Sequence, residues 1–104
     1  MNQTPQKFTQ PLKILVVEDN AIDRRILETM LHEFSRPVSL LKSAETLAGA
    51  IQLLEQHSFD VVILDLNLPD SEGKDTLTSL STKYPEVTIV INTGAYEDEL
   101  GINT

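Results

Sequence analysis

Several residue types are scarce or absent in this sequence, and each absence excludes a class of protein. Cysteine is absent, which excludes a disulfide framework and a thiolate metal site. Positive charge is scarce: 8 lysines and arginines stand against 16 aspartates and glutamates, and the formal net charge of −8 disfavours nucleic acid and anionic membranes as direct partners. The apolar runs, such as residues 14–17, are far shorter than the roughly 20 residues that span a bilayer, and no signal peptide is visible. We therefore expect a cytoplasmic protein.

The 104 residues alternate between strand-like and helix-like patterns. Short apolar runs rich in β-branched residues predict four strands, at 14–17, 38–41, 59–64 and 87–92. Residues 1–10 are polar and without an apolar period, so we expect a flexible tail followed by one domain over 11–104. The alternation predicts an α/β fold with a parallel sheet.

Apolar residues at helical spacing predict a helix between each pair of successive strands. The first helix should pack a stripe on the sheet, made of Ile22, Ile26, Leu27, Met30, Leu31 and Phe34. The second should begin with Ser43 as its N-cap, and the third, at 71–83, has a weaker pattern.

Carboxylates directly follow two of the predicted strands. Asp65 comes after the run 61–64, and Glu18-Asp19 comes after the run 14–17. Ligands of open α/β sheets bind outside the carboxyl ends of the strands, so these acids are placed to meet there. A carboxylate can attack a phosphoryl group and hold it as an acyl phosphate, which makes Asp65 a candidate nucleophile. Attack by an anion on an anion needs a hard cation, and we expect Mg²⁺ at these carboxylates.

Each of these acids also has an alternative structural role. Asp65 could cap the turn after its strand, and Glu18 and Asp19 could favour the start of the next helix through its dipole. Asp23 and Asp70 lie nearby in the sequence, and helix-start and turn roles are predicted for them.

In order and spacing, the motif residues resemble the receiver domain of two-component response regulators from about residue 13 onward. They are Glu18-Asp19, Asp65 with Pro69 and Gly73 after it, and Thr93-Gly94. The resemblance implies a flavodoxin-like, doubly wound parallel sheet, with strand order 2-1-3-4 and the fifth strand of the family absent from this sequence. It also implies that Asp65 accepts a phosphoryl group from a histidine kinase or a histidine phosphotransfer protein.

The resemblance further implies a role for each site residue. Asp19 would bind Mg²⁺ directly, Glu18 would do so largely through water, and the backbone carbonyl of Asn67 would complete the protein ligands around Asp65. The Thr93 hydroxyl would be the switch group, drawn toward the phosphoryl oxygens. The domain would then be a signalling module rather than an enzyme.

The sequence departs from the family at its end. Receivers continue into a fifth strand that ends in a lysine and then a fifth helix, and this sequence stops before either. Two interpretations stay open: a piece of a longer chain, or a degenerate pseudo-receiver that serves as a protein-binding module. A third, a Mg²⁺-dependent phosphatase with Asp65 as nucleophile, is opposed by Asn67, because the haloacid dehalogenase superfamily has a second acid at that position. The outer edge of strand 87–92 would lack a partner, which predicts a homodimer through that edge.

Overall fold

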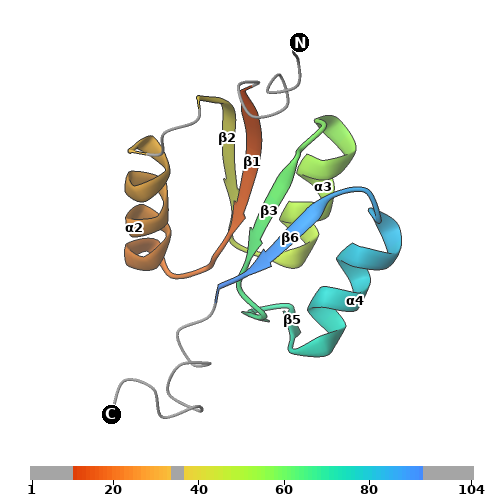
Figure 1. Ribbon diagram of the computed structural model, residues 1–104. Helices are drawn as coiled ribbons and strands as arrows, with labels where there is room; N and C mark the ends of the chain where they lie inside the picture. Colours follow the sequence, from red (N-terminus) through yellow and green to blue (C-terminus); the bar gives the residue numbers. More distant parts are fainter. Residues whose placement is uncertain (1–10, 34–36, 93–104) are drawn as a thin grey trace.

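The computed structural model of the protein describes residues 11–33 and 37–92. Its elements in chain order are β1 (Leu12–Val17), α2 (Ala21–His32), β2 (Val38–Ala44), α3 (Leu47–Gln56), β3 (Val61–Leu64), β4 (Asn67–Leu68), β5 (Ser71–Glu72), α4 (Lys74–Lys83) and β6 (Thr88–Ile91) (Figure 1). Within these ranges no helix has the length and apolar character needed to cross a membrane.

Four parallel strands form the central sheet in the order β2-β1-β3-β6. This order confirms the prediction of 2-1-3-4, because β6 is the fourth strand-like run of the sequence. Val17 at the end of β1 pairs with Ala44 of β2 on one side and with Leu64 of β3 on the other. The carboxyl ends of these three strands therefore lie at one edge of the sheet.

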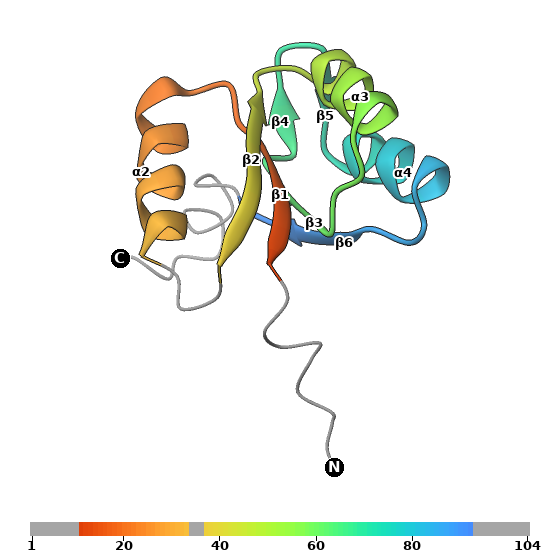
Figure 2. The same cartoon turned by 90° about the horizontal axis from the view of Figure 1, so that it is seen from above.

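Helices cover both faces of the sheet (Figure 2). Figure 2 shows α2 on one face and α3 and α4 together on the other. The main core lies beneath α3 and α4, where β1 and β3 contribute Leu15, Val17, Val62 and Leu64, each at most 1% exposed. Burial of both faces of β1 explains why its sequence is a continuous apolar run rather than an alternating one.

The prediction that Ser43 caps the second helix is wrong. Ser43 lies inside β2, which continues to Ala44 because the pairing with β1 extends that far. Thr46 is the N-cap instead, and its hydroxyl accepts the backbone N–H of Gly49 at 3.0 Å.

The third helix begins later than predicted. Residues 67–72, of which 71 and 72 are predicted to be helical, form a short antiparallel hairpin in which Leu68 pairs with Ser71. α4 starts at Lys74, after Gly73. Gly73 has φ of 60°, a conformation that a side chain disfavours, so this glycine allows the change from hairpin to helix.

The stripe predicted for the first helix is only partly buried. Leu27 and Leu31 are half-buried, while Ile22, Ile26 and Met30 are 71%, 52% and 61% exposed. Residue 34 lies outside the described residues. The prediction that the whole stripe packs on the sheet is therefore wrong for Ile22, Ile26 and Met30, which the described part of the chain leaves uncovered, whereas Leu27 and Leu31 are partly covered.

Candidate metal centre

Glu18 and Asp19 follow β1 at the carboxyl edge of the sheet. The Glu18 backbone N–H donates to the carbonyl of Ala44 at 3.0 Å, which continues the strand pairing one residue past β1. The residue is only 4% exposed, and its carboxylate accepts the backbone N–H of Asn20 at 3.2 Å. Asp19 is exposed. Two neighbouring acids thus have opposite environments, one buried and one in contact with solvent.

The turn into α2 is held by two polar side chains. Asn20 is the N-cap, and its Oδ1 accepts the backbone N–H of Asp23 at 2.9 Å. Arg24 donates through Nη1 to the carbonyl oxygen of Glu18 at 2.9 Å, and its Nη2 lies 3.5 Å from Oε2 of Glu45. The Arg24 side chain is 19% exposed, so a largely buried cation supports the backbone that carries the acidic pair.

Asp65 reaches the same edge from β3. Its backbone N–H donates to the carbonyl of Val17 at 3.0 Å, so β1 and β3 are still paired where Asp65 leaves the sheet. The Asp65 side chain is half-buried, and Oδ1 accepts the backbone N–H of Asn67 at 3.0 Å. This short-range bond is an Asx turn, so the capping role considered from the sequence exists and fixes the carboxylate orientation.

These three acids form a compact cluster. Glu18, Asp19 and Asp65 each offer one carboxylate oxygen, and these oxygens lie within 4.8 Å of one another. The pKa of Glu18 is raised to about 7, chiefly by burial and also by the neighbouring Asp65 carboxylate, against the lowering effect of the Asn20 hydrogen bond. Three oxygen donors crowded in this way fit a hard divalent cation such as Mg²⁺, which would relieve their repulsion.

The other predicted site residues lie as follows. Asn67 is exposed at the start of β4, directly beyond the Asx turn. Thr93 lies outside the described residues. Asp23 is in the first turn of α2, as predicted, whereas Asp70 accepts two backbone N–H groups from the start of α3 in addition to lying in a turn.

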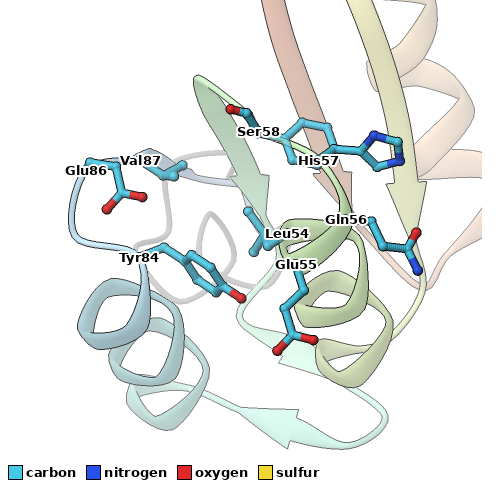
Figure 3. Close-up of a pocket in the computed structure, with 9 residues that line it drawn as sticks. Leu54, Glu55, Gln56, His57, Ser58, Tyr84, Glu86 and Val87 are labelled. Atoms are coloured by element: carbon cyan, nitrogen blue, oxygen red, sulfur yellow. The ribbon is translucent and has the colours of Figure 1, made fainter.

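A cavity lies at the opposite edge of the sheet (Figure 3). It has a volume of about 290 Å³ and lies between the C-terminal ends of α3 and α4. The acidic trio, by which we mean Glu18, Asp19 and Asp65, does not line it. Figure 3 shows the Tyr84 side chain directed toward Leu54 and Glu55, and its buried hydroxyl has no hydrogen-bond partner among the described residues. The cavity is therefore separate from the candidate metal centre.

Comparison with known families decides the classification. The profile of the response regulator receiver domain matches residues 14–103, nearly the whole chain. The chain belongs to the response regulator receiver family. The parallel order β2-β1-β3-β6 and the acids after β1 and β3 agree with this membership, so the protein is a signalling domain of the two-component type.

Individual relatives support the same classification of this receiver domain. A protein-glutamate methylesterase/protein-glutamine glutaminase of Rhodospirillum rubrum is 32% identical over 81 residues, which are 78% of this chain and 21% of the relative. The chain thus spans about a fifth of that relative's length. Two structures of the response regulator MaeR are similar. A mutant bound to sulfate has a TM-score of 0.75 and 28% sequence identity, and the match covers 91% of this chain and 81% of the MaeR chain. A form bound to beryllium trifluoride has a TM-score of 0.73 and 31% sequence identity, and the match covers 86% of this chain and 76% of the MaeR chain.

Sequence reasoning missed two residues that support the candidate metal centre. Arg24 had a signal, because an arginine in the first turn of a helix right after an acidic pair can reach back to the backbone that carries the pair. Asn20 also had one, since asparagine before an apolar helical period is a preferred N-cap.

Proposed function

We propose that this receiver domain accepts a phosphoryl group on Asp65 with the help of Mg²⁺. The observation that carries the proposal is the convergence of Asp65, Glu18 and Asp19 at the carboxyl edge, with oxygens within 4.8 Å. The relative MaeR adds support, because one of its structures holds beryllium trifluoride, a ligand that mimics a phosphoryl group in shape and charge.

Asp65 is the proposed nucleophile. Its Oδ1 is held by the N–H of Asn67, which leaves Oδ2 available for attack. A bond forms between Oδ2 and phosphorus while the bond between phosphorus and the donor histidine nitrogen breaks, and that nitrogen keeps the electron pair. Mg²⁺, when bound, would neutralise the negative charge shared by the carboxylates and the phosphoryl oxygens.

The remaining residues have supporting roles in this proposal. Asp19 binds the cation directly, because it is exposed and free to turn toward an ion. Glu18 is buried and acts through a bound water, and the backbone carbonyl of Asn67 is the third protein ligand. The switch role of the Thr93 hydroxyl stays a prediction, since that residue lies outside the described part of the chain.

The proposed donor is a histidine kinase or a histidine phosphotransfer protein of the cytoplasm. The net charge of −8 opposes direct nucleic acid contact by this domain. A pseudo-receiver that only binds proteins would not need the acidic trio, which is complete here. A phosphatase of the haloacid dehalogenase kind would need an acid at position 67. Asn67 has an amide side chain there, and its contact with Asp65 is made by the backbone N–H.

Phosphorylation by a small donor tests the proposal. Acetyl phosphate with Mg²⁺ should add one phosphoryl group to the protein, measured as intact mass and mapped by peptide analysis. Asp65→Asn should abolish the product and Asp19→Asn should reduce it strongly. Asp75→Asn, which changes an exposed acid in the first turn of α4, should leave it unchanged. A product that persists in Asp65→Asn, or that maps to Asp70 or a hydroxyl, would contradict the assignment.

A further inference from the structure

The hairpin of β4 and β5 begins two residues after the proposed nucleophile. Its base is anchored at the carbonyl of Leu66, which accepts the backbone N–H of Gly73 at 2.9 Å and the hydroxyl of the fully buried Thr76 at 3.0 Å. The Ser71 hydroxyl adds a bond of 2.7 Å to the Thr76 hydroxyl. The hairpin is therefore attached to the start of α4 through Leu66 at its base and through Ser71 in its second strand.

The tip of the hairpin has a separate attachment. The pair formed by Leu68 and Ser71 closes a turn that contains Asp70. The Asp70 carboxylate accepts the backbone N–H of Leu47 at 2.8 Å and of Ala48 at 3.0 Å, one with each oxygen. These N–H groups belong to the first turn of α3, where a helix has free donors and a partial positive charge. In Figure 2, β4 and β5 lie beside the start of α3.

The contact also stabilises the charged form of Asp70. The bonds from Ala48 and Leu47 hold the pKa of Asp70 below its usual value, so the group is a carboxylate throughout the neutral range. Thr46 separately satisfies the N–H of Gly49. The first turn of α3 thus uses one side chain of its own and one from the hairpin, 22 or 23 residues away in sequence.

We propose that Asp70 is a positioning residue for the metal centre. Asn67, whose backbone carbonyl is a proposed Mg²⁺ ligand, is the first residue of the hairpin and pairs with Glu72. Without the Asp70 contact, the hairpin is attached to α4 alone and can rock about the chain at Leu66, and rocking moves that carbonyl relative to Asp65. Attachment of the tip to α3 adds a second helix as support, so the carbonyl is oriented before the ion arrives. The inference rests on the proposed function, because it presumes a Mg²⁺ site.

A Mg²⁺ titration of the protein tests the inference. Binding is followed by NMR through the backbone amides of Glu18, Asp65 and Asn67, and the wild-type protein and Asp19→Asn serve as the binding and non-binding references. Asp70→Ala should raise the Kd for Mg²⁺ by about tenfold, the lower end of the effect of removing a contact that supports a metal ligand. Asp70→Asn, which keeps one acceptor oxygen, should give a smaller rise and remains informative if Asp70→Ala does not fold.

Thr46→Ala is the matched control for helix stability. It weakens the same end of α3 by removing the hydroxyl that caps Gly49, without touching the hairpin. The Kd should therefore stay within twofold of wild type in Thr46→Ala, although the melting temperature falls.

The outcomes separate this inference from the proposed function. The positioning role is overturned if Asp70→Ala and Asp70→Asn have the same Kd as wild type while Asp19→Asn abolishes binding. That result leaves the proposed metal site intact. An equal rise of the Kd in Thr46→Ala also overturns it, because Asp70 would then act only as a helix cap. A wild-type protein that binds no Mg²⁺ overturns both the metal proposal and the inference.

Discussion

Glu18 should make the stability of the metal-free protein depend on pH in an unusual direction. In the folded protein, burial raises the pKa of this carboxyl from 4.5 to about 7, whereas the unfolded chain titrates near 4.5. Between these values the folded protein holds a proton that the unfolded chain has released. The free energy of unfolding therefore falls as pH rises from 4.5 to 7 and is level above 7. At about 1.4 kcal/mol per pH unit, the fall amounts to roughly 3 kcal/mol.

Magnesium should reverse this trend. The ion binds the deprotonated carboxylates, so a proton on Glu18 competes with it, and the affinity should drop by about tenfold for each pH unit below 7. Because the ion binds only the folded state, the stabilisation that it adds grows with pH over the same interval in which the metal-free protein loses stability.

Urea unfolding at several pH values between 5 and 8, with and without Mg²⁺, measures both effects. Glu18→Gln should remove the falling slope of the metal-free protein, because the amide carries no proton to release. Glu86→Gln, an exposed acid at the opposite edge of the sheet, should keep it. Asp70 does not affect the free energy of unfolding between pH 5 and 8, because its pKa is lowered. Its contribution to stability is lost only as the pH falls below this range. An unchanged slope in Glu18→Gln would refute the reasoning.

Two further predictions follow from the contacts around the acidic trio and the sheet edge. Arg24→Gln should lower the free energy of unfolding by about 1 to 2 kcal/mol, because Arg24 gives a charged hydrogen bond to the Glu18 carbonyl and pairs with Glu45. The control Arg25→Gln changes an exposed residue and should lower it by less than about 0.5 kcal/mol. Equal losses of the two variants in urea unfolding would argue against the Arg24 contact. β6 pairs with β3 only, within the described residues, and Val90 is 47% exposed, so the protein should dimerise through that edge with rising concentration; a sedimentation profile that stays monomeric would exclude this.

The strands and the acids that follow them could be predicted because they depend on signals that the sequence carries locally, whereas the strand order was implied by the resemblance to the receiver family. A continuous apolar run identifies a strand covered on both faces, and the acid at its end shows which edge faces a ligand. The structure brings the acids after β1 and β3 within 4.8 Å, and Val17 accepts a hydrogen bond from the Asp65 N–H. Local pattern and topology agree there, and this agreement made Asp65 and the Glu18-Asp19 pair visible as candidates.

The errors arose where a distant partner determines the local structure. Ser43 is as good a helix cap as Thr46 when judged alone, but pairing of β2 with β1 keeps Ser43 extended. Similarly, the period of Ile22, Ile26 and Met30 specifies that one side of a helix is apolar, and it does not specify which side the neighbouring strands contact. Propensity and periodicity describe an element by itself, whereas these boundaries and orientations come from packing.

Asp70 shows the same limit for function. Its sequence context, after a proline and before Ser71, predicts a turn, and the structure has that turn. The hydrogen bonds from Leu47 and Ala48 depend in addition on the parallel sheet. Its strand order brings the loops after β2 and β3 to the same edge, on either side of β1. Arg24 uses the same neighbourhood when it contacts Glu45. The segment before and at the start of α3 carries no proposed ligand, yet it contacts both loops that do, through Glu45 and through the N–H groups of Leu47 and Ala48. Loss of these contacts should therefore alter Mg²⁺ binding without touching the ion, whereas loss of the Thr46 cap, which contacts neither loop, should not.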